Sequence, residues 1–159
     1  MNISETNEKP FIIRLAEEKN IPLLAEIFKN DLGYSDCTEE TVRSQFAKLN
    51  PERETVFIAS LSNSNSENES AAVGVIHVEL YNTLYFPTLA NLLALAVNSE
   101  YRKTGIVTAL LKAAEKWAVL HGSSYMRLNS GIDRVNAHRF YQNRGYNIGK
   151  DQKRLMKKL

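Results

Sequence analysis

The chain has 159 residues, about the length of one globular domain, and its 43% hydrophobic and 24% charged residues exclude a disordered tail, a collagen-like fibre and a coiled coil. Its net charge of +2 is unevenly spread, with −6 over residues 1–70 and +8 over residues 71–159. The positive second half therefore favours an anionic partner such as a nucleic acid, a phosphorylated cofactor or a membrane surface.

The first third of the chain predicts one strand and two helices. Phe11–Leu15 is a short apolar run typical of a strand. We expect a first helix after Asn20, which can cap it, with Pro22 in its first turn. A second helix is expected to start at Thr38, whose side chain can cap it, and to end before Pro51.

Three strands are expected in the middle of the chain. Thr55–Leu61 and Ala71–Tyr81 are rich in β-formers, and the Ser/Asn/Glu stretch 62–70 between them has nothing to bury. This pattern predicts a hairpin whose tip at 62–70 is solvated and flexible. Asn91–Val97 is an apolar run, which is typical of a central strand.

The last third predicts two helices and three strands. Apolar residues recur at helical spacing over Gly105–His121, which predicts a long amphipathic helix. Tyr125–Leu128 is expected to be a strand and Arg134–Arg144 a helix that Gly145 ends. We expect Tyr146–Leu159 to form a closing pair of strands.

The order of these elements, without an internal repeat, predicts one α/β or α+β domain over residues 1–159. The single cysteine, Cys37, excludes an intramolecular disulfide and a cysteine-based zinc site, and the histidines lack ligand-like spacing, so we expect no metal. No apolar run reaches the roughly 18 residues of a membrane span, and Met1–Lys9 is polar, unlike a signal peptide. We therefore expect a cytoplasmic protein without a membrane partner.

The segment Leu92–Leu111 joins a buried strand to a helix through a basic loop. A helix N-terminus carries unpaired N–H groups and about half a positive charge, and so binds anions. Arg102 and Lys103 add full charges, Gly105 allows a close approach of the backbone, and Thr108 offers a hydroxyl. This chemistry suits a pyrophosphate, although neither G-x-G-x-x-G nor G-x-x-x-x-G-K-[ST] occurs in the chain. The alternative is a basic turn with a glycine for tight packing.

Two motifs, in order along the chain, resemble those of a known family. Arg102–Val107, with the sequence RKTGIV, resembles the acetyl-CoA-binding motif R/Q-x-x-G-x-G/A of the GNAT family of N-acetyltransferases. Asn136–Tyr146 is similar to the family's later element N-A-x-x-x-Y-x-x-x-G-[FY]. The resemblance covers residues 92–146. It implies a single domain with a mixed central sheet flanked by helices, and an N-acetyltransferase with acetyl-CoA as its co-substrate.

The resemblance also implies roles for particular residues. The backbone of the central strand would pair with the pantetheine arm as an extra strand does, through Leu95, Ala96 and Val97. The pyrophosphate would be held by the loop and the helix start, which comprise Arg102, Lys103, Thr104, Gly105, Ile106, Val107 and Thr108. Asn136 would contact the pantetheine or the phosphates, and Tyr141 would protonate the leaving thiolate. An N–H near Val97 would stabilise the oxyanion.

The general base is where the sequence departs from the family. Histone-type relatives carry a glutamate early in the central strand, and the matching residue here is Asn91, which cannot accept a proton. His77 and Glu79 share one face of the preceding strand and are the candidate bases, the alternatives being a water-mediated base or a polar pair at an exposed edge. Val107 is a second departure, since the family has glycine or alanine there. Its side chain either crowds the phosphate or points into the core.

The acceptor is expected to be a primary amine of a small molecule or peptide. Its site would be lined by the first two helices and by a loop from Tyr81 to Ala90 that contains Tyr85 and Phe86. Acidic residues of that region favour a cationic acceptor such as a polyamine, an aminosugar antibiotic or a lysine side chain. These residues are Asp31, Asp36, Glu39 and Glu40. Small members of the family often dimerise, so a homodimer is a candidate assembly.

Two other classes of function are left open. A GNAT-like fold can hold acyl-CoA as a sensor or interaction domain without catalysis, and Asn91 and Val107 support this alternative. The intact motif residues favour an enzyme. Nucleic-acid binding would depend on a group of basic residues near the end of the chain, which are Lys150, Lys153, Arg154, Lys157 and Lys158. No nucleic-acid motif accompanies them, and a basic edge strand is the simpler explanation, so we expect no nucleic-acid partner.

Overall fold

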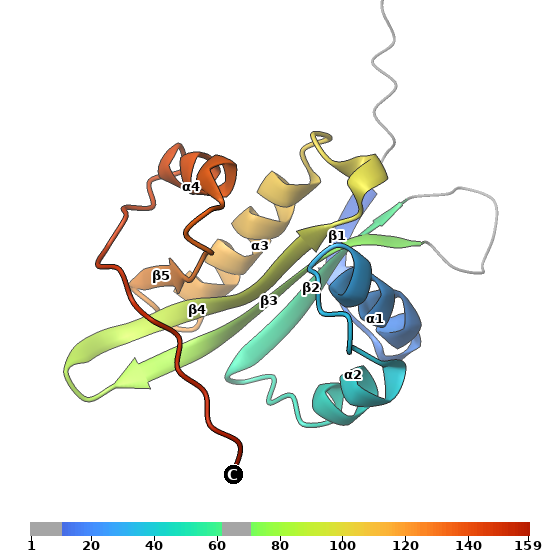
Figure 1. Ribbon diagram of the computed structural model, residues 1–159, viewed down its shortest axis with the longest axis horizontal. Coiled ribbons are helices and arrows are strands. Elements are labelled where there is room, and N and C mark those ends of the chain that lie inside the picture. Colours follow the sequence, from blue (N-terminus) through green and yellow to red (C-terminus); the bar gives the residue numbers. More distant parts are fainter. Residues whose placement is uncertain (1–10, 62–70) are drawn as a thin grey trace, which may run out of the picture. The chain divides into compact units, whose positions relative to one another are not determined.

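The computed structural model describes residues 11–61 and 71–159 (Figure 1). These residues form two compact units, one that ends at Met126 and one from Arg127 to Leu159. The predicted flexible tip at 62–70 lies outside the described residues, and the single-domain organisation stays a prediction.

Five strands form one sheet in the order β1-β2-β3-β4-β5. Their bounds are β1 Phe11–Leu15, β2 Glu54–Leu61, β3 Ala72–Thr83, β4 Phe86–Val97 and β5 Tyr125–Leu128. The first four pair antiparallel, whereas α3 (Ile106–Leu120) connects β4 to its neighbour β5, as a parallel pair requires. The predicted α/β class with a mixed central sheet is confirmed.

The expected loop from Tyr81 to Ala90 is instead the closed end of a hairpin. Tyr81 pairs with Leu89 and Thr83 with Phe86, so that β3 and β4 are both longer than predicted. The loop prediction was wrong because strand pairing across the turn continues through residues that carry no continuous apolar run.

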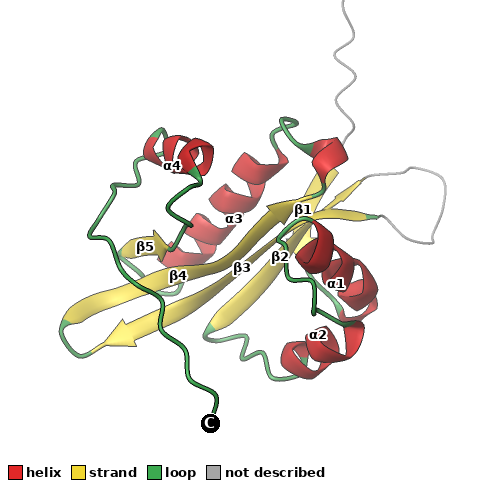
Figure 2. Cartoon of the chain, in the orientation of Figure 1, coloured by secondary structure: helices red, strands yellow, loops and turns green. Residues whose placement is uncertain are grey.

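Three helices flank the sheet in the first unit. Figures 1 and 2 show α1 (Ile21–Asn30) and α2 (Glu39–Phe46) on one face and α3 on the other. Pro22 lies in the first turn of α1, and the Thr38 side chain caps α2 by accepting a hydrogen bond from the N–H of Thr41 at 3.1 Å. Asn20 precedes α1, but its side chain accepts from the N–H of Glu17 at 2.9 Å and does not cap the helix. None of the described helices is long and apolar enough to cross a membrane.

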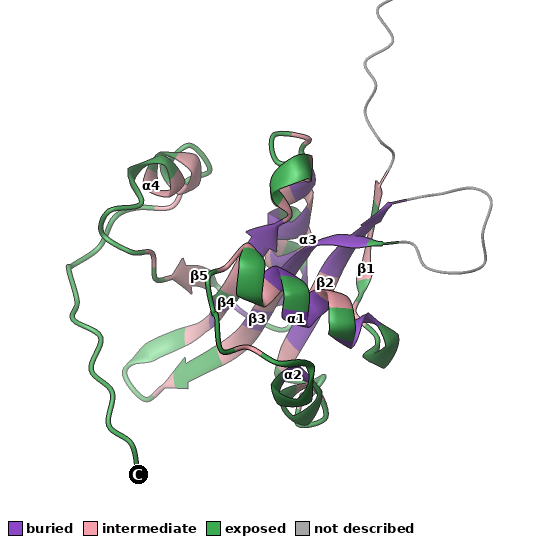
Figure 3. Ribbon diagram, turned by 45° about the vertical axis from the view of Figure 1, so that its right-hand side comes forward, coloured by how far each residue is buried: buried purple, intermediate pink, exposed green. Residues whose placement is uncertain are grey.

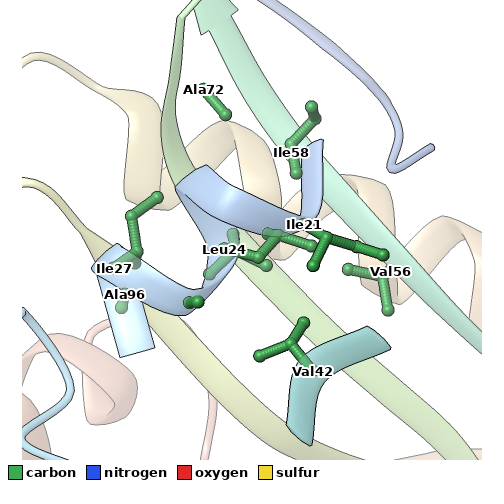
Figure 4. Packing of buried hydrophobic residues seen from close by; sticks show 10 residues of the cluster. Ile21, Leu24, Ile27, Val42, Val56, Ile58, Ala72 and Ala96 are labelled. Carbon is green, nitrogen blue, oxygen red and sulfur yellow. The ribbon is translucent and has the colours of Figure 1, made fainter. Parts of the chain in front are cut away.

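Buried apolar residues lie on both faces of this sheet, and Figure 3 shows buried residues in the strands and in the helices α1 and α3. Figure 4 shows the cluster on the α1 and α2 face, where Ile21, Leu24 and Ile27 of α1 pack against Val56 and Ile58 of β2. On the opposite face, the buried residues of α3 recur at helical spacing and are Ile106, Leu110, Leu111, Ala114, Trp117 and Ala118. Because β3 lies between these two layers, its residues from 72 to 76 are all buried.

The N-terminal end of α3 lies close to the backbone of β3 at Gly74. A Cβ atom at Gly74 would lie 3.0 Å from Cγ2 of Val97 and 3.1 Å from both Cγ2 of Ile106 and Cδ1 of Leu110. Since real Cβ contacts are almost always longer, glycine lets the helix and the end of β4 approach the sheet this closely.

The second unit contains the end of β5 and one helix, α4 (Val135–Gln142), where the sequence predicts Arg134–Arg144. Within this unit, Tyr146–Leu159 contains no strand, so the predicted closing pair and the basic edge strand were wrong (Figure 2). A strand pair needs a packed apolar face to be stable, and four of the segment's large apolar side chains are exposed: Ile148, Leu155, Met156 and Leu159.

Gly74→Val should destabilise the protein by about 1 to 3 kcal/mol, because the added side chain overpacks the contact with α3. Urea unfolding measures the change. Gly149→Val is the matched control, since nothing lies within 4 Å of a Cβ built there. Equal stability of the two variants would show that α3 does not need the close approach at Gly74.

Candidate active site

The C-terminal half of β4 has backbone groups that point away from β3. Asn98 donates its N–H to the carbonyl of Val73 at 2.8 Å, so the backbone groups of Asn98 face β3. Because N–H and C=O groups alternate between the two edges of a strand, those of Leu95 and Val97 face the opposite edge.

Among the residues of the first unit that the structure describes, no strand pairs with that edge at Leu95 and Val97. The neighbouring strand β5 has only 4 residues, whereas β4 has 12. Just before β5, the N–H of Ser124 donates to the carbonyl of Thr88 at 3.2 Å, and Thr88 lies near the start of β4, far from Leu95 and Val97. The Val97 carbonyl accepts a bond from Nε of Arg102 at 3.3 Å. The N–H groups of Leu95 and Val97 and the Leu95 carbonyl are therefore placed to pair with an extended ligand.

A bulge interrupts β4 just before this open edge. His77 of β3 pairs with Ala94 but its neighbour Val78 pairs with Leu92, so that Leu93 is an extra residue. A bulge puts two successive side chains on one face of a strand. Leu93 and Ala94 accordingly both line the same cavity.

The loop that follows β4 has the backbone conformation of an anion-binding site. Lys103 and Gly105 both have left-handed φ angles, of 64° and 86°, and no side chain caps α3. Left-handed residues turn successive N–H groups toward one point, and the N–H groups of Ile106 and Val107 in the first helical turn have no partner within the helix. Val107 is half-buried, with part of its side chain in contact with solvent.

Arg102 of this loop is paired with a carboxylate of α1's C-terminal end. Its Nη2 lies 3.5 Å from Oδ1 of Asp31, whose side chain is only 10% exposed. The same oxygen accepts the N–H of Ser99 at 3.2 Å. Asp31 therefore anchors the loop to the end of α1.

The two candidate bases lie on β3, each beside a polar partner. Nε2 of His77 is 3.2 Å from Oε2 of Glu54 on β2, and both side chains are about three-quarters buried. Glu79 lies directly across from Asn91 and accepts a hydrogen bond from its amide at 3.1 Å. Asn91, which was matched to the glutamate of histone-type relatives, is thus an amide that binds a carboxylate of the neighbouring strand.

A cavity of about 510 Å³ opens beside the bulge, between the α1–α2 segment and the sheet. His77 lines it, and Glu79 does not belong to its lining. Tyr81, Tyr85 and Phe86, expected at the acceptor site, do not line it either, because they belong to the far end of the β3–β4 hairpin.

The other two predicted site residues belong to α4 in the second unit. Asn136 is exposed in the first turn, and Tyr141 is half-buried with its ring 5.3 Å from that of Phe140 and 5.5 Å from that of Tyr146. Burial raises the pKa of the Tyr141 phenol, against a smaller lowering by Arg134. Tyr141 therefore keeps its proton well above neutral pH. In the part of the chain that the structure describes, no three His, Cys, Asp or Glu residues are grouped to hold a metal.

Three functional features escaped the sequence analysis. Glu54 beside His77 and Asp31 beside Arg102 depend on pairing between distant segments, which spacing along the chain does not report. The bulge at Leu93 had one weak signal, the two apolar residues Leu92 and Leu93 in succession, which an uninterrupted buried strand shares.

A family model described as the Acetyltransferase (GNAT) family matches residues 21–146. The chain belongs to the GNAT acetyltransferase family. No curated protein sequence matches it.

Solved structures share its fold. A transcriptional regulator from Bacillus halodurans is 20% identical with a TM-score of 0.79, covering 92% of this chain and 99% of that one. The aminoglycoside N-acetyltransferase AAC(6')-Iy in complex with CoA is 14% identical with a TM-score of 0.78, covering 94% and 96%. Glucosamine-6-phosphate N-acetyltransferase from Arabidopsis thaliana is 13% identical with a TM-score of 0.76, covering 92% and 98%. At these identities the likeness is one of fold.

Gly105→Ala should destabilise the protein by about 1 to 2 kcal/mol, because the left-handed φ of 86° strains any residue with a Cβ. The space around Gly105 is open, so strain is the only effect expected. Gly105→Asn should recover part of the loss, since asparagine tolerates this conformation better. Denaturant unfolding checks both against Gly149→Ala, and a Gly105→Ala variant as stable as that control would contradict the strained geometry.

Proposed function

We propose that the chain is an N-acetyltransferase that transfers the acetyl group of acetyl-CoA to a primary amine by direct attack. The observation that carries the proposal is that three parts of a binding site for an extended anionic ligand follow one another along the chain. The open edge of β4 at Leu95 and Val97 runs into a left-handed basic loop and the uncapped first turn of α3. Membership of the GNAT acetyltransferase family supports acetyl transfer as the class of reaction.

The residues of this feature fit the chemistry of acetyl-CoA. Its pantetheine arm carries amides, which can pair with the backbone groups of Leu95 and Val97 as an added strand does. Its pyrophosphate needs N–H donors and positive charge, which the loop and first helical turn supply from Arg102 to Thr108. Asn136 is the further contact that we assign to the pantetheine or the phosphates. When bound, acetyl-CoA supplies the activated acetyl thioester.

A base must remove a proton from the acceptor before attack. A primary ammonium with a pKa near 10.4 is neutral only about once in 2,500 molecules at pH 7. We assign this role to His77, which lines the cavity, with Glu54 orienting its ring and stabilising the imidazolium. Glu79 is the second candidate, and its carboxylate is held by Asn91.

Two further groups complete the proposed mechanism, one as a hydrogen-bond donor to the oxyanion and one as a proton donor to the thiolate. The N–H of Val97, on the open edge, is the donor that we assign to the developing oxyanion. Tyr141 gives its proton to the departing thiolate, and its raised pKa keeps that proton available. The carbon–nitrogen bond forms and the carbon–sulfur bond breaks. His77 takes the first proton of the ammonium before attack, and the second proton, released from the nitrogen through solvent, replaces the one that Tyr141 gives to the thiolate.

The melting temperature should rise by roughly 5 to 11 °C with acetyl-CoA at 100 times its Kd, because binding of that strength adds about 2.7 kcal/mol. Thermal unfolding with and without the ligand measures the shift. An amine-acceptor panel with detection of the released thiol then tests transfer. A shift without transfer to any amine would favour the sensor alternative.

Lys103→Gly isolates the loop's charge, since glycine keeps the left-handed φ of 64°. It should weaken acetyl-CoA binding about fivefold or more, as expected for a lost charge-assisted contact. Lys153→Gly, in the exposed segment after α4, is the matched control. No melting shift at millimolar acetyl-CoA in the unchanged protein would overturn the proposed function.

Tyr141→Phe should lower kcat about a hundredfold with little change in acetyl-CoA affinity, because only the proton donor is lost. Burial raises the pKa of Tyr141 above its ordinary value of 10.0, so the unchanged protein should keep its turnover through pH 9 and lose this donor only at higher pH. Tyr85→Phe, at an exposed turn, is the control. Steady-state kinetics across pH decide the matter, and equal turnover in Tyr141→Phe removes this residue from the mechanism.

A further inference from the structure

The cavity beside the bulge has mostly apolar walls. Its apolar lining comes from α1, the segment after it and β4, and consists of Phe28, Leu32, Tyr34, Cys37, Leu93 and Ala94. Leu93 is 44% exposed and Tyr34 55% exposed. These side chains leave apolar surface in contact with water that a ligand would cover.

Negative charge is scarce in the same cavity. Asp36 is the one acidic residue of its lining among the described residues. Asp31 is occupied by Arg102 and the N–H of Ser99, and Glu39 and Glu40 lie in the first turn of α2, where carboxylates stabilise the helix dipole. Of the four acidic residues expected to attract a polycation, Asp36 is therefore the one that lines the cavity.

We propose that the acceptor is a monoamine carried on a single apolar arm, an alkyl- or arylalkylamine. This inference depends on the proposed function and names the substrate class of its acceptor site. The amine reaches His77, and the arm covers Leu93, Leu32 and their apolar neighbours. A polycation would bring further ammonium groups against apolar walls with one carboxylate to meet them, which costs their hydration.

The volume agrees with a small ligand. About 510 Å³ lies within the range of roughly 300 to 1,000 Å³ that small-molecule sites occupy. The bulge contributes directly, because it turns Leu93 as well as Ala94 toward the cavity.

Cys37 provides a readout that does not need catalysis. It is the chain's only cysteine, it lines the cavity, and it is half-buried. Its alkylation by iodoacetamide, followed by intact mass at fixed pH and ionic strength, therefore reports whether the cavity is filled. Binding is measured with and without S-methyl-CoA, which has no acetyl group to transfer.

At ten times its Kd, 3-phenylpropylamine should slow alkylation of Cys37 about tenfold, in proportion to occupancy, whereas spermidine at equal ionic strength should leave the rate within about twofold. Leu93→Gln should raise the amine concentration needed for protection about tenfold, because apolar contact is lost. Leu155→Gln, at an exposed leucine outside the cavity, should leave it unchanged.

Protection by spermidine equal to or better than that by 3-phenylpropylamine would overturn the inference. So would absence of protection by either amine while acetyl transfer to some amine persists, since the acceptor would then bind elsewhere. Protection by 3-phenylpropylamine without any acetyl-CoA melting shift would instead sustain the ligand class and overturn the proposed function.

Discussion

The close contact between α3 and the backbone of β3 at Gly74 is the constraint on which the site depends. Val97, the last residue of β4, and Ile106, the first of α3, both pack on this glycine. The contact therefore fixes the distance between the end of the open strand edge and the uncapped helical turn. Those are the two parts that an extended, phosphorylated ligand would have to meet together. A bulkier residue at 74 would change this spacing while leaving every chemical group of the site in place.

Features encoded in neighbouring residues could be predicted from the sequence. Phe11–Leu15 forms the expected strand, Thr38 caps the second helix, and the expected long amphipathic helix starts directly after Gly105. Each signal acts over one turn or one strand, so no knowledge of the rest of the fold is needed. The Tyr146–Leu159 strands failed for the opposite reason, because a strand forms only where another element offers an edge and an apolar face.

The parts of the site that could not be predicted arise from partners on separate elements. His77 was a candidate base by its alternation along β3, but its partner Glu54 follows from the register of β2. The same register logic explains the departure at Asn91. The sheet places Glu79 directly across from it, so that a carboxylate of the neighbouring strand lies beside this amide. A comparison of residue 91 by position alone does not show this neighbouring carboxylate.

The bulge at Leu93 divides β4 into two segments, and the face of the sheet that odd-numbered residues occupy before the bulge is occupied by even-numbered residues after it. Before it, Asn91 faces the α1 side of the sheet, and after it Ala94 and Ala96 do. If the same residues formed a strand without a bulge, with the segment from Ala94 to Val97 held in place, Leu92 would stand beside Glu79 and Asn91 would turn to the α3 face. The extra residue therefore decides which side chain of β4 stands beside Glu79, and loss of the bulge would alter that position without any substitution at 91.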